Sequence, residues 1–243
     1  MRPDELEQRL GDIDCLFHYT TIEAALEHIL PDETLRFSPV RSTNDPREYK
    51  EWSFMGVGSI PKSGSNHLHL LEINAAINTL VGSEYKVACF SQNTEDRAGY
   101  LKSRMWSQYG QSHGGVCVVF SKSKLISSLR NWPSQESPFY DEVTYTAEMK
   151  IHADALVVSL DELEREPTDS VARKHAIEHN RELFFTKHSD YKDECEYRLV
   201  IHDCEPGYSF VKTNECIMSI PVNSARHSGG KLPPGRWCEP RSA

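Results

Sequence analysis

Two short stretches, far apart in the chain, carry the residue types best suited to chemistry. The first, residues 17–20, has the sequence FHYT, and the second, residues 193–198, has the sequence DECEYR. His18 falls at the end of an apolar run and just before a stretch with helical periodicity. A ring nitrogen at this place can bond a ligand, and the N-terminus of the helix beside it favours anionic groups such as pyrophosphate. The alternative is a half-buried histidine that bonds only the backbone.

The second stretch contains a pair of carboxylates. Glu194 and Glu196 are two residues apart, so on an extended segment they point to the same face. Paired carboxylates repel each other unless a cation or a polar ligand lies between them, and we expect one of them to have a raised pKa. Arg198 continues the alternation and can neutralise the pair. An exposed strand end with a salt bridge is the alternative.

Three further positions are candidates for ligand contacts. Tyr109, in the sequence WSQYG at residues 106–110, belongs to an aromatic segment that either stacks on a flat ring or covers the core. Asn44 precedes Asp-Pro and either bonds a ligand or caps a helix. Ser91 ends an apolar strand and bonds either a ligand or the backbone.

Other kinds of site have little support in the sequence. His175 and His179 are four residues apart on an expected helix, which suits zinc, but no third ligand is evident. The glycine-rich dinucleotide motif, the phosphate-binding loop of nucleotide triphosphatases and the nucleophile elbow of serine hydrolases are all absent from the sequence.

These residues must be positioned by short strands and irregular helices. Period-two and apolar runs predict strands near residues 15–19, 34–38, 85–91, 116–120, 142–145, 197–202, 208–212 and 216–222. Helical periodicity predicts helices near residues 3–10, 21–31, 67–82, 122–130, 150–163 and 168–186. Residues 92–114 and 187–195 are predicted to be polar and irregular, and 116–120 to be a buried central strand. The absence of regular strand–helix alternation favours an α+β fold.

Composition sets the broad class. The 243 residues, 38% hydrophobic and 26% charged, predict a single folded domain over residues 1–223 and a loosely ordered tail over 224–243. A net charge of -9 disfavours broad, non-specific binding of nucleic acid. Scattered cysteines without a C-x-x-C pair, no apolar signal segment and no bilayer-length apolar run predict a cytoplasmic protein that does not enter a membrane.

The order of the motifs resembles that of a widespread bacterial family with a domain of unknown function. Its pattern is an L-[YF]-H-Y-T-[ST] opening, then N-D-P-x-E, C-F-S, M-W-x-x-Y-[GA] with H-x-G-[VI]-C, and E-x-E-[YW]-R. The corresponding segments here are residues 16–21, 44–48, 89–91, 105–117 and 194–198. Tyr191 is a departure, because tryptophan is expected there, but the change keeps an aromatic ring.

That family in turn resembles the ADP-ribosyltransferases, which implies a mixed or antiparallel split sheet with flanking helices and NAD as the substrate. On this resemblance His18 bonds the adenosine ribose and Tyr109 is the aromatic near the nicotinamide. Glu196 bonds the nicotinamide ribose and stabilises the oxocarbenium-like transition state, and Glu194 orients the acceptor. The residues expected to contact NAD are His18, Tyr19, Thr20, Asn44, Ser91, Tyr109 and Arg198.

The leading hypothesis is therefore an NAD-dependent ADP-ribosyltransferase or NAD glycohydrolase whose acceptor is protein, nucleic acid, a small molecule or water. By analogy alone it would be a bacterial toxin or anti-phage effector. A module of the same fold that binds a nucleotide or a protein without catalysis is the second hypothesis. A metal-dependent nuclease that uses Asp193, Glu194 and Glu196 as cation ligands is the third.

Overall fold

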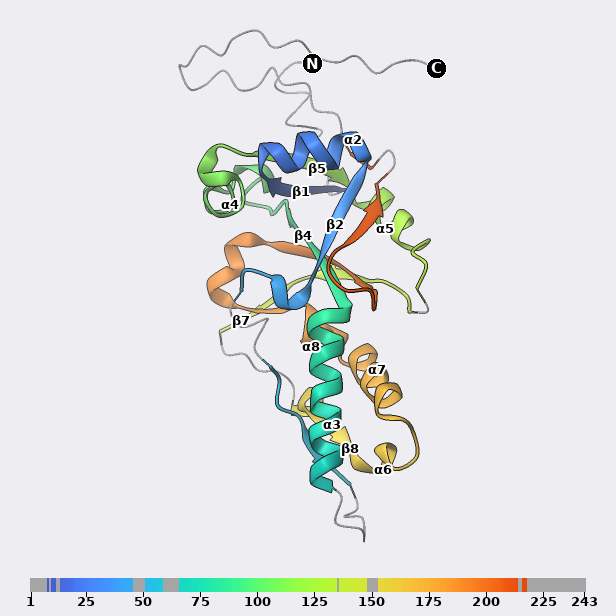
Figure 1. Cartoon of the computed structure of the whole chain (residues 1–243). Helices are drawn as coiled ribbons and strands as arrows, with labels where there is room; N and C mark the ends of the chain where they lie inside the picture. The colour runs from blue at the N-terminus through green and yellow to red at the C-terminus, as the bar shows by residue number, and fades with distance from the viewer. Residues whose placement is uncertain are drawn as a thin grey trace, which may run out of the picture.

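A curled antiparallel sheet forms one end of the molecule, and a group of helices forms the other (Figure 1). The computed structural model describes residues 8, 10–11, 14–45, 51–58, 66–134, 136–147, 153–213 and 216–217. The tail expected over residues 224–243, most of the helix expected over 3–10 and most of the strand expected over 216–222 lie outside these ranges. The α+β class with a largely antiparallel sheet agrees with the expectation from the sequence.

Seven strands form the main sheet, and every pairing within it is antiparallel. They are β1 (Cys15–Thr20), β2 (Thr34–Pro39), β4 (Tyr85–Gln92), β5 (Val116–Ser121), β6 (Phe139–Glu142), β10 (Glu196–His202) and β11 (Ser209–Lys212). Two short parallel pairs lie outside it. They are β3 (Met55–Val57) with β8 (Val157–Ser159), and β7 (Thr144–Thr146) with β9 (Thr186–His188).

The sheet divides along one edge of β4. Strand β10 pairs with β4 over its length, from Tyr85 to Ser91. Because a strand has only two edges, β1 and β2 must share the other edge. Strand β2 pairs near Val87, whereas β1 pairs at Ser91 and the residue after it. The ladder is therefore open around Cys89, and β1 and β2 diverge from this point.

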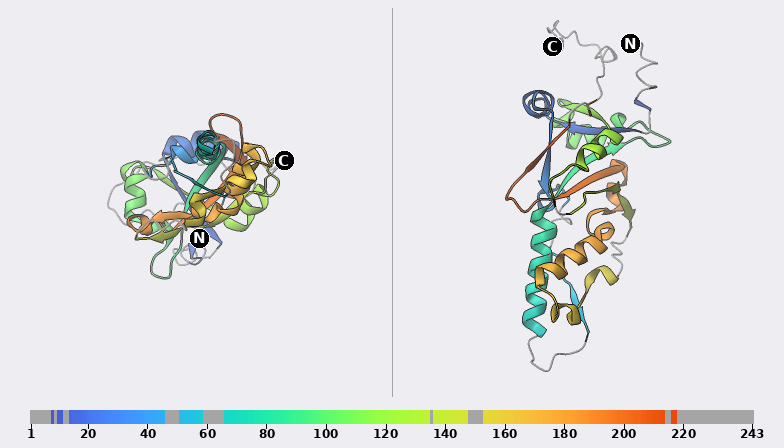
Figure 2. Two further views of the ribbon diagram at one scale, coloured as in Figure 1. Left: turned by 90° about the horizontal axis from the view of Figure 1, so that it is seen from below. Right: turned by 90° about the vertical axis from the view of Figure 1, so that its right-hand side faces the viewer.

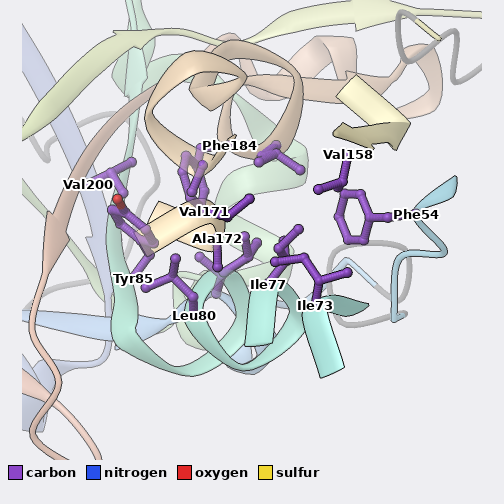
Figure 3. Close-up of a cluster of buried hydrophobic side chains, with 14 of the residues drawn as sticks. Phe54, Ile73, Ile77, Leu80, Tyr85, Val158, Val171, Ala172, Phe184 and Val200 are labelled. Carbon is purple, nitrogen blue, oxygen red and sulfur yellow. The ribbon is translucent and has the colours of Figure 1, made fainter. Parts of the chain in front are cut away.

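Helices at the far end pack on the sheet through a continuous apolar core. These elements are α3 (Asn66–Thr79), η3 (Leu80–Glu84), η6 (Ala153–Leu156), α6 (Leu160–Leu163), α7 (Thr168–Glu178) and α8 (Asn180–Phe184). Ile73 and Ile77 of α3 are fully buried and belong to the same cluster as Tyr85 and Val200 of the sheet (Figure 3). Figure 2 shows α3 extending away from the sheet with α7 beside it, and these two helices are in contact. The core thus joins the two ends of the molecule.

The remaining helices cover the sheet end. They are η1 (Ala24–Ile29), α2 (Leu30–Asp32), η2 (Val40–Ser42), η4 (Gly99–Leu101), α4 (Ser103–Gln108), η5 (Gln111–His113), α5 (Lys122–Leu129) and η7 (Ser189–Glu194). Thr21 begins the helical segment that leads into η1, because its Oγ1 accepts a hydrogen bond of 3.1 Å from the Ala24 amide. Ala25 and Ile29 of η1 are buried against the sheet, as the sequence predicts. Ile22, just before η1, and Leu26 within it are exposed.

Several other expectations from the sequence were wrong in detail. Strand β5 pairs with β1, and on its other side a bridge joins Phe120 to Ile217, at the start of the strand expected over residues 216–222. The helix expected over 168–186 is divided into α7 and α8, and residue 186 already belongs to β9. The helix expected over 150–163 contains the short strand β8, and α4 forms within the segment expected to be irregular.

Two asparagines of α3 bind an extended segment as a neighbouring strand would. Asn74 accepts a hydrogen bond from the Phe54 amide and donates one to the Phe54 carbonyl, over 2.8 and 3.1 Å. Asn78 makes the same two bonds to the backbone of Trp52, over 2.7 and 2.9 Å. The side chains thereby satisfy backbone groups that would otherwise be unpaired.

Replacing Asn74 by alanine is therefore expected to lower the free energy of unfolding. Two backbone groups of Phe54 lose their partners, and the loss should be about 1–2 kcal/mol after the better helix propensity of alanine is included. Urea unfolding of the variant measures the change. Asn131→Ala is the control, because the side chain of Asn131 is exposed and makes one long bond of 3.5 Å. Equal stability of the two variants would contradict this role of Asn74.

Candidate functional site

A pocket of about 470 Å³ lies in the opening of the sheet between β1 and β2. Strand β4 forms its floor around Cys89, and η1 contributes Ala24 and His28 to its lining. The residues of the first motif and those of the last motif, which lie at opposite ends of the sequence, meet here. The sequence-predicted residues that line this pocket are His18, Tyr19, Thr20, Asn44, Tyr109, Glu194, Glu196 and Arg198.

His18 closes the opening of the sheet with its side chain. Its Nδ1 lies 3.1 Å from the carbonyl oxygen of Cys89, in the stretch of β4 where neither β1 nor β2 continues the ladder. A carbonyl only accepts, so Nδ1 carries the proton and Nε2 of the neutral ring is an acceptor. Burial lowers the pKa of His18, and the nearby charge of Arg36 lowers it further. The hydrogen bond to the Cys89 carbonyl raises this pKa but does not outweigh the burial. The ring is therefore neutral near pH 7 and presents an acceptor for a ligand hydroxyl.

The two glutamates are brought together by a turn rather than by an extended strand. Glu194 is the last residue of η7, and Glu196 is the first residue of β10. Cys195 between them is in the left-handed conformation, with φ 43° and ψ 59°. The expectation of alternation along an extended segment was therefore wrong at Glu194, although both side chains still line the pocket.

Two buried cations hold the carboxylates. Lys187 Nζ lies 3.0 Å from Glu194 Oε2 and 2.8 Å from Glu196 Oε2, so it bridges the pair. Arg198 donates from Nε to Glu196 Oε1 over 2.6 Å and from Nη2 to Glu196 Oε2 over 3.2 Å. All four side chains are at most 5% exposed. The formal charges of this cluster, two negative and two positive, cancel.

This arrangement determines the pKa of Glu196. Burial opposes ionisation of Glu196, but the charges of Arg198 and then Lys187 outweigh it, so the pKa of Glu196 lies well below its ordinary value. The ammonium of Lys187 lies between Glu196 and Glu194. Glu196 is thus a carboxylate at physiological pH.

Two side chains hold the backbone at Glu194 in place. Its carbonyl oxygen accepts a bond of 2.7 Å from Ser91 Oγ and one of 3.0 Å from Lys102 Nζ. Ser91 is fully buried and does not line the pocket, so the expected ligand contact is replaced by a positioning role. Tyr109 contacts the side chain of the same glutamate, because its hydroxyl donates to Glu194 Oε1 over 3.2 Å. Burial and the charge of Glu194 raise the pKa of Tyr109, which therefore stays a hydrogen-bond donor.

The remaining predicted residues differ in their exposure. Tyr19 is 6% exposed, and its hydroxyl donates to the Gly99 carbonyl over 2.5 Å, which fixes the loop before α4. Its ring packs edge-on against Trp106. Thr20 is half-buried at the end of β1, and Asn44 is exposed at the mouth of the pocket. Residues 46–48 of the motif around Asn44 lie outside the described residues.

The donors that a metal would need do not converge. Asp193 is exposed, whereas its neighbours Glu194 and Glu196 are buried and bridged by an ammonium. His175 is 7% exposed and bonds the carbonyl oxygen of Ala155 over 3.0 Å. Within the described ranges, no three side chains of His, Cys, Asp or Glu are grouped so that they could hold a metal ion. The carboxylates are thus arranged for lysine and arginine.

Several lining residues were missed by sequence reasoning. Lys187 lies on β9, in a stretch expected to be an irregular polar loop, and no local pattern distinguishes it from the lysines around it. Arg36, Tyr208 and Phe210 also line the pocket. The strand pattern of β2 and β11 places Arg36 and Phe210 on the outward face, but only the pairing of these strands brings them to the site.

The protein has an α+β fold with a divided antiparallel sheet. Its pocket contains a buried cluster of two carboxylates and two cations whose formal charges cancel. Residues 105–199 match the model of a family described as "Protein of unknown function (DUF2971)". The expected resemblance to a family with a domain of unknown function is thereby confirmed, and the matched range includes two of the motifs that suggested it. Searches of the curated proteins and of the solved structures gave no match. Among the described helices, none has both the length and the apolar character to cross a bilayer.

Proposed function

We propose that this pocket binds NAD and that the protein is an ADP-ribosyltransferase or NAD glycohydrolase. One observation carries the proposal: His18 and Glu196, which come from opposite ends of the chain, line the same pocket. Its volume of about 470 Å³ lies within the usual range for small-molecule sites. At one position a neutral imidazole offers an acceptor, and at another a buried carboxylate stays ionised.

These groups suit cleavage of the nicotinamide–ribose bond. When that bond breaks, its electron pair leaves with nicotinamide, which is neutral, and positive charge develops on the ribose. A fixed carboxylate stabilises this charge more in the transition state than in the ground state. Glu196 is assigned this role, His18 the ribose hydroxyl of the adenosine half, and Tyr109 the contact with the nicotinamide ring. Glu194 is assigned to orient the acceptor.

A second candidate is favoured by the bonding of Glu196. Arg198 and Lys187 engage both of its carboxylate oxygens, and the Cys89 thiol lies beside it. A carboxylate held by two cations has less charge to offer to an oxocarbenium ion. A module that binds the nucleotide and does not cleave it is consistent with this bonding.

Incubation with NAD in the presence of a chelator tests the proposal directly. Release of nicotinamide without metal supports the enzyme, and saturable binding of NAD without release supports the binding module. Failure to bind NAD in calorimetry would reject both. In a separate assay without the chelator, cleavage of DNA or RNA that requires magnesium would instead favour the nuclease hypothesis. An ADP-ribose label retained on an added protein would separate a transferase from a glycohydrolase.

His18→Ala is expected to weaken NAD binding about tenfold, because the variant loses one buried hydrogen bond to the ligand. The same change leaves the Cys89 carbonyl without its partner, so binding should be measured well below the melting temperature of the variant. His113→Ala is the matched control, since His113 is exposed and does not line the pocket. Equal affinity of the His18 variant and the control would count against the assigned role.

A further inference from the structure

Two aromatic side chains stand open to solvent at the mouth of the pocket. Tyr208 is 53% exposed and Phe210 is 57% exposed, and both line the pocket. Large apolar side chains scattered over a surface are ordinary, but a pair of aromatic rings gathered at a cavity marks a surface that a ligand covers. This pair lies outside the motifs with which the function has been argued so far.

The pair is held in place by the strand and loop that carry it. Phe210 of β11 is directly opposite Arg36 of β2 in the antiparallel register, so their side chains share one face. The guanidinium carbon of Arg36 lies 4.6 Å from the centre of the Tyr208 ring. The side chains thus form a continuous surface of ring, guanidinium and ring.

The loop before Tyr208 is fixed by a buried lysine. Lys86 of β4 is fully buried, and its Nζ donates to the carbonyl oxygen of Glu205 over 2.7 Å. The same Nζ lies 3.3 Å from Asp203 Oδ2. Asp203 also accepts bonds from the Ser209 hydroxyl and from the Glu205 amide. Tyr208 is therefore presented from an anchored turn, which reduces the entropy lost when a ligand stacks on it.

Polar groups beside the rings supply hydrogen bonds. Ser42, Thr43 and Asn44 line the pocket with Arg36. Thr43 Oγ1 is buried and has no hydrogen-bond partner within the described part of the chain. Because this oxygen is closed to solvent, the exposed side chains of Ser42 and Asn44 supply the hydrogen bonds to a ligand. The surface therefore offers stacking, hydrogen bonds and one positive charge in the same place.

From these contacts we infer that Arg36, Tyr208 and Phe210 form the subsite for the purine base and adjacent phosphate of a nucleotide. The base stacks on the aromatic rings, and the phosphate lies beside the guanidinium. In this arrangement the adenylate half of NAD occupies the mouth of the pocket and the nicotinamide half lies toward Glu196. The orientation of NAD rests on the proposed function, whereas the purine subsite itself does not.

Binding of AMP, NAD and nicotinamide mononucleotide, measured by calorimetry, tests the subsite. Phe210→Leu and Tyr208→Leu keep an apolar side chain but remove the ring, and each is expected to weaken AMP and NAD at least about fivefold. Nicotinamide mononucleotide has no purine, so its affinity should not change. Arg36→Gln is expected to weaken AMP but not adenosine, because only AMP carries the phosphate. Leu101→Ala is the control, since Leu101 is 59% exposed and does not line the pocket.

The outcomes separate the subsite from the proposed function. If AMP binds and the ring variants weaken it while NAD is not cleaved, the subsite stands and the enzymatic proposal fails. If NAD is cleaved but the ring variants bind AMP and NAD as the wild type does, the subsite is overturned and the enzymatic proposal stands. Failure of the wild type to bind AMP at millimolar concentration also overturns the subsite.

Discussion

Glu196→Gln is expected to lower the rate of nicotinamide release from NAD by about 100- to 1,000-fold, the usual loss when a fixed electrostatic group is removed from a transition state. Glutamine keeps the size and one acceptor oxygen of the side chain but not its charge. The carboxylate is ionised in the wild type because Arg198 and Lys187 hold its pKa low, so the substitution removes a full charge at neutral pH. Steady-state and single-turnover rates, expressed per mole of folded protein, measure the effect.

Two companion variants make this result specific. Glu142→Gln is the same chemical change at an exposed position of the neighbouring strand β6, outside the pocket, and should leave the rate unchanged. Glu194→Gln should preserve hydrolysis better than transfer, because Glu194 is assigned to the acceptor. A Glu196→Gln protein that binds NAD and keeps more than about a third of the wild-type rate would show that Glu196 serves the salt-bridge cluster alone, since removal of a catalytic group of this kind costs about 100-fold.

Arg198→Met is expected to lower the free energy of unfolding by about 3–5 kcal/mol, which is typical when one partner of a buried ion pair is removed. Arg198 is 1% exposed and donates from Nε and Nη2 to the two carboxylate oxygens of Glu196. It also donates from Nη1 to the carbonyl oxygen of Phe184 over 2.7 Å. Methionine fills part of the space but leaves Glu196 with Lys187 as its remaining cation. Chemical unfolding at neutral pH measures the loss.

The matched control is Arg181→Met, which removes an exposed ion pair with Asp141. Such pairs contribute about 0–1 kcal/mol, so the two arginine variants should differ clearly in stability. Arg198→Lys should recover only part of the loss, because an ammonium cannot make the forked contact. Equal free energies of unfolding for Arg198→Met and Arg181→Met would show that the buried cluster stabilises the fold no more than the exposed ion pair does.

The destabilisation by Arg198→Met should also depend on pH. In the wild type the folded-state pKa of Glu196 is depressed, so its stabilising contribution is complete above the ordinary pKa of 4.5 and is lost as pH falls toward the folded value. Without Arg198 the folded-state pKa rises, and Glu196 takes up a proton at a higher pH. The difference in stability between wild type and variant should therefore shrink as pH falls through the folded-state pKa of Glu196 in the variant, toward its lower value in the wild type. A constant difference over this range would argue against the charge of Glu196 as its origin.

The local elements of the fold could be predicted because their signals are local. Period-two apolar patterns identified β1, β2, β4, β10 and β11, and helical periodicity identified α3 and α5. The predicted boundaries of helices were wrong where tertiary contacts interrupt a local pattern. This happened at β8 and β9, whose pairing partners are distant in the sequence.

The sequence by itself determined which residues had the chemistry for a site: a histidine before a helix, two glutamates and an arginine near a strand start, and a tyrosine between them. Only the tertiary structure decided how they combine. The opening in the sheet places His18 on the Cys89 carbonyl, and β9 brings Lys187 between the two glutamates. A pKa depends on which charges lie within a few ångströms, and that is a property of the packed chain. The repulsion expected between Glu194 and Glu196 is therefore replaced, in the folded protein, by a neutral cluster.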